Sequence, residues 1–275
     1  MQKRIISGAV YVGILTAFFL LRQLVDDRIF NLFIYFLMVA GTFEMARATK
    51  KITIKGSLYL SIIYSAILLP LYYTFEYKLF YGHGNLAVIY LFALMMIINL
   101  VLSIILSIQP QKLLWTILLY VDPALLLYIM FLTNMNSEYA FIMLILAFVI
   151  SPISDTFAYF VGSKIGGKKL CPKLSPKKTW SGAIGGTVGG IISSIVVYLI
   201  FKPQLSVGSP IIFFLILGVL ASVINIFGDL FESFIKRKVG IKDMGKIMPG
   251  HGGILDRFDG MMFTSVLISL VFLII

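Results

Sequence analysis

Long apolar runs recur along this chain of 275 residues, and they limit its fold more than any other feature. Nine runs are each about 17 to 24 residues long, close to the ~20 residues that an α-helix needs to cross the core of a bilayer. They cover residues 5–21, 29–46, 57–75, 86–108, 113–133, 139–162, 181–201, 209–231 and 258–275. Alternation of apolar and polar residues nowhere reaches the length of a membrane strand, so helices make every crossing. The sequence therefore predicts an all-α integral membrane protein with about nine transmembrane helices.

The composition excludes an ordinary soluble domain. Hydrophobic residues make up 60% of the chain, whereas soluble proteins contain ~45–50%. Lys3 and Arg4 precede the first apolar run, as in a signal peptide. A convincing cleavage site is missing and eight further runs follow, so we expect a retained helix. Cys171 is the only cysteine, which excludes a disulfide framework.

The basic residues predict the orientation of the helices. With nine crossings, 19 of the 23 Lys and Arg residues fall on one side of the membrane and 4 on the other. The positive-inside rule then places the N-terminus in the cytoplasm and the C-terminus outside, in the inner cell membrane. The formal net charge of +11 follows from this topology and from attraction to anionic lipid headgroups. We therefore expect the lipid bilayer, and no nucleic acid, as a partner.

The two halves of the chain differ in their chemistry. Residues 1–138 hold five of the predicted helices and few residues that indicate chemistry, and we expect them to form a scaffold. Residues 139–275 hold the other four helices and two large basic loops, and we expect them to carry a catalytic pocket that faces the cytoplasm. In the scaffold, Glu44 and Arg47 lie three residues apart, so we expect them to pair with each other.

Three of the predicted helices contain residues that interrupt their apolar character. Asp122, beside Pro123, is either a functional acid or a packing residue at a proline kink, and the sequence leaves both open. Pro152 lies among the polar residues of segment 151–155 and removes a helical hydrogen bond. It predicts a break in the sixth helix that opens into an aqueous pocket. Glycines spaced four residues apart across 182–190 predict the close approach of another helix, within one subunit or between two.

Charged residues gather at the end of the eighth helix and the start of the ninth. One face of the eighth helix carries five polar residues: Asn225, Asp229, Glu232, Ser233 and Lys236. Asp256 and Asp259 open the ninth helix, where the helix dipole stabilises a carboxylate, whereas Asp229 lies near a helix C-terminus and lacks that stabilisation. Carboxylates on two helix faces among Lys and Arg suit Mg²⁺ and a polyphosphate. Cys and His are too scarce for a zinc site, and the nucleophile elbow of a serine hydrolase is missing.

Two groups of residues resemble one known family. The first comprises Asp155, Ala158-Tyr159, Gly162, Leu170, Pro172-Lys173, Ser175-Pro176, Lys177-Lys178-Thr179-Trp180 and Gly182. The second comprises Ser233, Lys236-Arg237, Lys242-Asp243, Pro249-Gly250-His251-Gly252-Gly253, Asp256-Arg257 and Asp259. Together they resemble the signatures of the phosphatidate cytidylyltransferases, also called CDP-diacylglycerol synthases, across residues 155–259. Phe157 and Ser181 depart from the pattern, since the family usually carries a small residue and a glutamate there, and both departures concern substrate positioning.

The resemblance implies a Mg²⁺-dependent nucleotidyltransferase of phospholipid biosynthesis. It implies that CMP passes from CTP to phosphatidic acid, giving CDP-diacylglycerol and pyrophosphate. It also implies that Asp229 and Asp256 hold Mg²⁺, alone or beside a second cation, and act with Lys236 and Arg237 as the catalytic residues. The implied substrate-binding residues are Asp155, Lys177, Lys178, Thr179, Ser233, Lys242, Asp243, His251, Arg257 and Asp259. A homodimer is implied as well.

Two other functions compete with this hypothesis. A CTP-dependent lipid kinase of the polyprenol type would transfer the γ-phosphoryl group and release CDP instead of pyrophosphate. A transporter of an organic anion is disfavoured, because the polar residues gather at the cytoplasmic end of the helices instead of the midplane and no internal repeat is evident.

Overall fold

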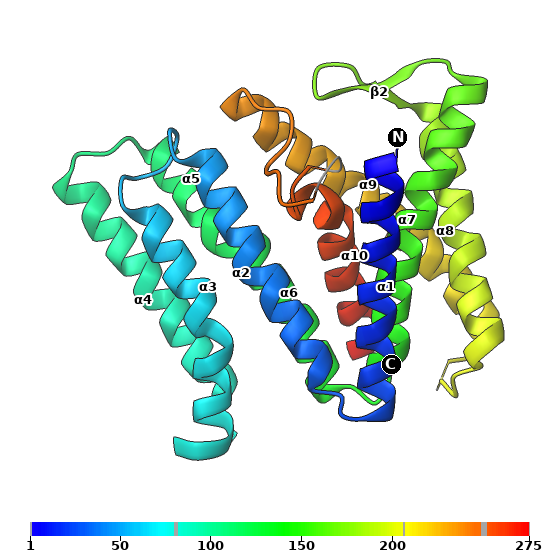
Figure 1. Cartoon of the computed structure of the whole chain (residues 1–275), viewed down its shortest axis with the longest axis horizontal. Coiled ribbons are helices and arrows are strands. Elements are labelled where there is room, and N and C mark those ends of the chain that lie inside the picture. Colours follow the sequence, from blue (N-terminus) through cyan, green and yellow to red (C-terminus); the bar gives the residue numbers. More distant parts are fainter. Residues whose placement is uncertain (1, 80–81, 206, 249–251, 275) are drawn as a thin grey trace. The chain divides into compact units, whose positions relative to one another are not determined.

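The computed structural model describes residues 2–79, 82–205, 207–248 and 252–274, and these form ten α-helices, two π-helical turns and one β-hairpin (Figure 1). Each of the nine predicted ranges corresponds to one helical segment, the fifth in three consecutive pieces, and apart from the end of the eighth the helix ends differ by a few residues. The hairpin is the only sheet in this described part of the chain. The prediction of an all-α integral membrane protein is confirmed.

Seven helical segments are long and apolar enough to cross a membrane. They are Ile29–Thr49, Ser57–Leu79, Gly84–Ile105, Pro110–Met135, Ala140–Ile165, Trp180–Phe201 and Pro210–Val239. The first helix, α1 (Gln2–Leu24), contains a shorter apolar stretch, Gly8–Leu24. The last, α10 (Leu255–Leu273), is 19 residues long and begins with charged residues. The count of nine crossings and the sides of the two termini therefore stay predictions.

The chain divides into two compact units, and each is described by itself. The first unit comprises Met1–Tyr128 with Ile241–Asp256, and the second comprises Ile129–Gly240 with Arg257–Ile275. The predicted division into residues 1–138 and 139–275 stays a prediction.

In the first unit, α2 (Ile29–Thr49), α3 (Ser57–Thr74) and α4 (Gly84–Ile105) pack side by side (Figure 1). The π-helical turn η1 (Phe75–Leu79) extends α3. The core of this unit is apolar and aromatic, and it includes Phe30, Ile34, Met38, Tyr64 and Leu68. Some buried polar side chains pair between helices, where water is absent. The Nδ2 of Asn99, for example, donates to the hydroxyl of Tyr120 over 3.0 Å.

The fifth predicted helix is built from three pieces. α5 (Pro110–Tyr120) and α6 (Leu126–Asn136) are joined by the π-helical turn η2 (Val121–Leu125). Asp122 lies in that turn with φ −114° and ψ 118°, and it is 4% exposed. Proline has no N–H and disfavours helical dihedrals in the residue before it, which explains the interruption at this position. The kink beside Pro123 is confirmed, and the role of Asp122 stays open.

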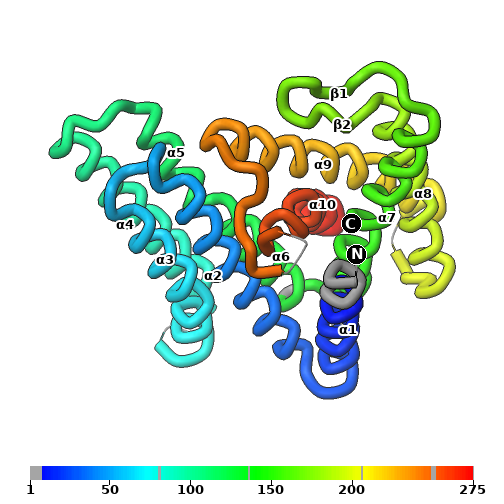
Figure 2. The backbone as a smooth tube through the Cα atoms, turned by 45° about the horizontal axis from the view of Figure 1, so that its top comes forward, coloured from blue at the N-terminus to red at the C-terminus, as the bar shows by residue number. Residues whose placement is uncertain are grey.

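In the second unit, α7 (Ala140–Ile165), α8 (Trp180–Phe201), α9 (Pro210–Val239) and α10 form the helical part. Strands β1 (Lys169–Cys171) and β2 (Ser175–Thr179) form an antiparallel hairpin that links α7 to α8 (Figure 2). The sequence analysis did not predict this hairpin, because both strands are short and lack the alternation of a half-buried strand.

Glycines bring α8 close to both of its neighbours. A Cβ added at Gly185 would lie 2.5 Å from the Cβ of Val161 on α7, and one added at Gly190 would lie 1.7 Å from the Oγ of Ser222 on α9. Real Cβ contacts are not this short, so larger residues would separate these helices. The predicted close approach at the glycine face is confirmed, and it occurs within a single chain.

Two expectations about where helices stop or break are wrong. α7 continues through Pro152 without a break, because proline in a membrane helix is tolerated where neighbouring groups satisfy the backbone. The aqueous pocket beside it stays a prediction. α9 continues to Val239, eight residues beyond the predicted end, so the negative end of its dipole does not reach Asp229.

Candidate functional site

Three elements of the second unit bring acidic and basic side chains together. Asp155 extends from α7, Asp229 from α9 and Lys178 from β2. Lys178 forms an ion pair with Asp229, and both side chains are partly exposed, at 25% and 28%. The hairpin is what delivers Lys178 to α9, so the pair depends on a feature that the sequence analysis missed. An ion pair at this exposure can exchange partners with a substrate.

Asn225 connects α7 to α9 beside this ion pair. Its Nδ2 donates to the Oδ1 of Asp155 over 2.8 Å, and its Oδ1 lies 2.6 Å from the hydroxyl of Ser151, which donates to it. Asn225 and Asp229 lie four residues apart and share one face of α9. The sequence analysis placed Asn225 on this face but gave it no role. Its partner is 70 residues away in the sequence, which is why the bond could not be foreseen.

Further carboxylates surround Asp229. The charged neighbours of Asp155 are Asp229, Asp259 and Lys178, and those of Asp259 are Glu232 and Asp229. The Nζ of Lys236 donates to the Oε2 of Glu232 over 3.1 Å, one helical turn away. The predicted catalytic Lys236 is thus held by an acidic neighbour on its own helix. Four carboxylates and two lysines in one region would attract a divalent cation.

The other predicted residues of the second unit lie around this group. Arg237 is exposed and donates from its Nε to the carbonyl oxygen of Leu174 in the hairpin, over 3.3 Å. Ser233 lies one turn from Asp229, with 3.5 Å between its Oγ and an Asp229 oxygen. Lys177 and Arg257 are exposed. Thr179 is 4% exposed and caps α8, because its Oγ1 accepts from the N–H of Gly182 over 3.1 Å.

The predicted residues of the first unit lie in the connection between α9 and α10 and in the first turn of α10. The Oδ2 of Asp256 accepts from the N–H groups of Met244 and Gly253, both over 2.8 Å. Lys242 and Asp243 are exposed in the same segment. His251, together with the preceding Pro-Gly pair, lies outside the described residues. Asp256 is therefore positioned by backbone groups, whereas Asp155 and Asp229 in the second unit are held by side chains.

The fit of a metal ion can be judged from these donors. Within the described ranges, no three His, Cys, Asp or Glu side chains are arranged as a ready-made metal site. Mg²⁺ usually binds one or two carboxylates together with waters and substrate phosphates. The partly exposed Asp229 offers a carboxylate of that kind, with Lys178 beside it for a phosphate. These donors fit Mg²⁺ that binds together with a substrate.

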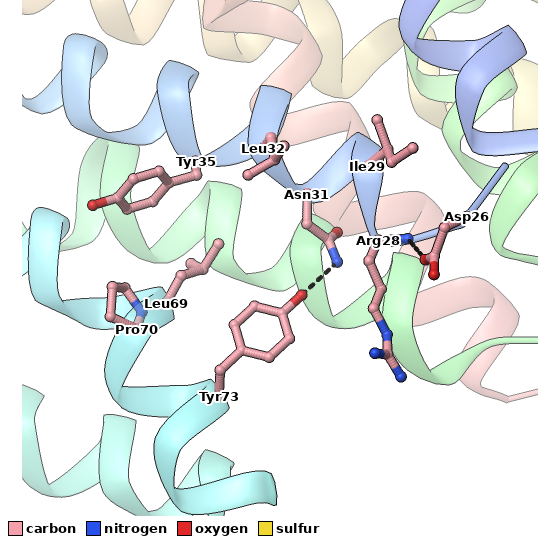
Figure 3. Close-up of a pocket in the computed structure, with 9 residues that line it drawn as sticks. All are labelled: Asp26, Arg28, Ile29, Asn31, Leu32, Tyr35, Leu69, Pro70 and Tyr73. Atoms are coloured by element: carbon pink, nitrogen blue, oxygen red, sulfur yellow. Dashed lines mark hydrogen bonds between the residues drawn. The ribbon is translucent and has the colours of Figure 1, made fainter.

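A cavity in the first unit has a different character. It has a volume of about 490 Å³ and opens at the N-terminal end of α2, lined mainly by apolar and aromatic residues (Figure 3). Its walls include Leu32, Leu69 and Pro70, and the Nδ2 of Asn31 donates to the hydroxyl of Tyr73 over 3.0 Å. The lining includes a single acid, so this cavity lacks the combination of carboxylates and lysines that phosphate chemistry requires.

One expectation about the first unit is wrong. Within the described residues, no ion pair joins Glu44 to Arg47. The Oε2 of Glu44 instead accepts from the N–H of Leu255 over 3.1 Å. These residues are 211 positions apart, and a lone glutamate near the end of a helix carries no sign of such a partner.

Comparison with known proteins gives one decisive match. The model of the cytidylyltransferase family matches residues 2–275, which is nearly the entire chain. The chain belongs to the cytidylyltransferase family. Membership confirms the resemblance found in residues 155–259 and extends the likeness to the N-terminal helices.

Curated relatives of this family member include three bacterial proteins named phosphatidate cytidylyltransferase. The protein of Thermotoga maritima is 35% identical over 125 residues, which are 45% of this chain and 46% of that protein. The protein of Brucella abortus is 39% identical over 135 residues, 49% of this chain and 48% of that protein. The protein of Bacillus subtilis is 35% identical over 127 residues, 46% of each chain. The chain thus spans about half the length of the curated relatives it matches.

Proposed function

We propose that this protein is a phosphatidate cytidylyltransferase, which transfers CMP from CTP to phosphatidic acid and releases pyrophosphate. The observation that carries the proposal is the match of the cytidylyltransferase family to residues 2–275. The names of the curated relatives support the choice of lipid substrate. The group around Lys178 and Asp229 supplies the acidic and basic side chains that such a reaction needs.

In the proposed reaction, an oxygen of the lipid phosphate attacks the α-phosphorus of CTP. A new P–O bond forms, the bond between the α-phosphorus and its bridging oxygen breaks, and pyrophosphate leaves with the electron pair. The lipid phosphate is already anionic at neutral pH, so it needs no dedicated general base. The protein has to bring two anions together, hold them in line and stabilise the charge that develops.

The chain's own basic residues are proposed to do most of this work. Lys178 is placed to bind a phosphate, because it lies beside Asp229 and is partly exposed. The exposed Lys177, Arg237, Lys242 and Arg257 are the proposed contacts for the triphosphate and the lipid phosphate. Lys236 and Asp259 would shape the local charge through Glu232, to which both are coupled.

We also propose that the reaction depends on Mg²⁺, with Asp229 and Asp256 as ligands and a second cation as an alternative arrangement. The family signature and the preference of Mg²⁺ for carboxylate oxygens support these two ligands. When bound, the ion would neutralise phosphate charge. The backbone N–H groups on Asp256 would fix the direction of its carboxylate before an ion arrives.

The membrane arrangement is part of the same proposal. We place the charged ends of α7 and α9 on the cytoplasmic side of the inner membrane, because 19 of 23 basic residues gather on that side in the predicted topology. A homodimer is proposed as well. The glycine face of α8 is occupied within the chain. A second copy would therefore have to use other surfaces, such as the exposed Ile184 and Val188.

The test uses purified protein in detergent with phosphatidic acid, Mg²⁺ and CTP labelled at the α-phosphorus. Label should enter the organic phase, with one pyrophosphate released for each labelled lipid. Release of CDP, with label left in water, would move the protein to the lipid-kinase alternative. Absence of both products from folded protein would contradict the proposal, and omission of phosphatidic acid is the control for CTP hydrolysis.

A further inference from the structure

Glu44 occupies an unusual place for a charged residue. It lies in the transmembrane helix α2 and is 2% exposed. Burial of a carboxylate away from water costs several kcal/mol unless it finds partners, so its presence calls for a specific role. The partner that it finds is the backbone of the segment before α10, through the 3.1 Å hydrogen bond from the N–H of Leu255.

Two glycines of that segment enclose the carboxylate. A Cβ added at Gly245 would lie 1.9 Å from the Oε1 of Glu44, and one added at Gly253 would lie 2.4 Å from its Oε2. At both glycines, the three atoms nearest to the added Cβ all belong to Glu44. The backbone at these two glycines therefore lies so close to the carboxylate that a larger residue at either position would force the Glu44 side chain to move.

The second oxygen of Glu44 is also directed at the segment. Oε1 is buried, and no donor meets hydrogen-bond distance and angle to it within the described part of the chain. The N–H groups of Ile247 and Ile254 nevertheless face the carboxylate. Several backbone dipoles thus converge on one side chain from the described residues on either side, 245–248 and 252–255.

Asp256 is fixed by the same segment. Its Oδ2 accepts from the N–H groups of Met244 and Gly253, and the Cα of Gly253 borders the carboxylate of Glu44. A movement of Glu44 would move Gly253, and with it a donor that orients Asp256. The two carboxylates share one stretch of backbone.

We propose that Glu44 is a positioning residue, which orders the backbone at residues 244–248 and 252–255 and thereby orients the carboxylate of Asp256. The inference rests on the proposed function only in the role given there to Asp256. Glu44 touches neither substrate nor metal in this proposal. Its carboxylate instead fixes the backbone that surrounds it. The N-terminal helices then contribute to the site as well as to the scaffold.

The first experiment compares Glu44→Ala with the unaltered protein by amide hydrogen exchange of residues 241–256. Removal of the Glu44 carboxylate should speed amide exchange throughout these residues. In the activity assay, the variant should show kcat lowered, and the Mg²⁺ concentration for half-maximal rate raised, by about 10- to 100-fold, as for residues that orient metal ligands. Glu44→Gln, which keeps the volume and one acceptor oxygen, should lie between Glu44→Ala and the unaltered protein.

Glu76→Ala is the matched control. The Oε2 of Glu76 also accepts one backbone N–H, that of Gly84 over 2.9 Å, but it belongs to η1. Its removal should change exchange near Gly84 and leave both the segment 241–256 and the Mg²⁺ requirement as they are. An equal rise in the Mg²⁺ requirement in both variants would point to general destabilisation and would overturn the specific role of Glu44.

A steric test keeps the proposal open to contradiction even if Glu44→Ala folds poorly. Gly245→Ala should displace the carboxylate, speed exchange at Leu255 and lower activity. In the Glu44→Ala background, the same substitution should have no further effect, because the atoms that it would strike are gone. Equal losses from Gly245→Ala in both backgrounds would overturn the proposal.

The exchange data separate this inference from the proposed reaction. If the unaltered protein makes no labelled lipid, the proposed function fails. Faster exchange in Glu44→Ala would still show that Glu44 orders the surrounding backbone. If the unaltered protein is active, and Glu44→Ala shows the same amide exchange and the same Mg²⁺ requirement as the unaltered protein, the positioning role is wrong.

Discussion

Two buried or metal-binding candidate carboxylates of the first unit and two carboxylates of the second are held by different kinds of donor. Asp256 and Glu44 in the first unit accept hydrogen bonds from backbone N–H groups. Asp155 and Asp229 in the second unit are held by the side chains of Asn225 and Lys178. A backbone donor cannot leave without a change in the fold, whereas a lysine can turn toward an arriving phosphate. The difference suggests fixed acids in the first unit and exchangeable contacts in the second.

The sharpest test of this difference replaces each proposed metal ligand. Asp229→Asn and Asp256→Asn should both lower CTP-dependent product formation by at least ~10³-fold, because a metal ligand and its charge are lost. Only Asp256→Asn should also speed hydrogen exchange in segment 244–253, since only Asp256 organises a backbone segment. Near-normal turnover in either folded variant would remove that residue from the proposed metal site.

Substitution of Lys178 tests whether this lysine can leave Asp229 and bind a phosphate. Lys178→Met should raise KM for CTP by about tenfold, equivalent to ~1.4 kcal/mol of binding free energy, since one phosphate contact is lost. Lys178→Arg should recover most of the affinity because it keeps the charge. Thermal stability should change little, as expected for a partly exposed ion pair. A large fall in stability with unchanged KM would make the pair structural.

Glycines extend the comparison from acids to packing. Gly185 packs α8 onto α7, whereas Gly245 packs against a carboxylate. Gly185→Ala should therefore reduce stability, by ~1–3 kcal/mol, because its Cβ would strike the branched Val161. Thermal unfolding in detergent measures this, with Gly13→Ala as the control, since nothing lies within 4 Å of an added Cβ there. An unchanged melting temperature for Gly185→Ala would show that α7 and α8 can separate without cost.

The smallest effect is expected at Asp122. This acid is buried where α5 meets η2, and the structural interpretation assigns it to packing beside Pro123. Asp122→Asn should keep most of the cytidylyltransferase activity at normal expression, as measured by the labelled-lipid assay. A loss of more than about a hundredfold, or ~2.7 kcal/mol, would instead place Asp122 in the catalytic machinery.

Much of the candidate site could be predicted because its residues are close in sequence. Asn225, Asp229 and Lys236 share a helix face by their spacing alone, and α9 confirms that they lie on one helix. The kink at Pro123 likewise followed from the local chemistry of proline. Local rules failed at Pro152, where α7 continues although proline removes one helical hydrogen bond. They also failed at the end of α9, where polar residues continue the helix beyond the apolar run.

The sequence alone determined that this protein lies in a membrane and to which family it belongs. A bilayer requires about 20 apolar residues for each helical crossing, so the long apolar runs in the sequence predict a helical membrane protein. The charged motifs are contiguous, so they indicate the family without a structure. Only the tertiary structure decided the partners of the acids: Lys178 reaches Asp229 through a hairpin, and Leu255 reaches Glu44 across 211 residues. Such pairs depend on how helices and loops pack, and no pattern of neighbouring residues records that.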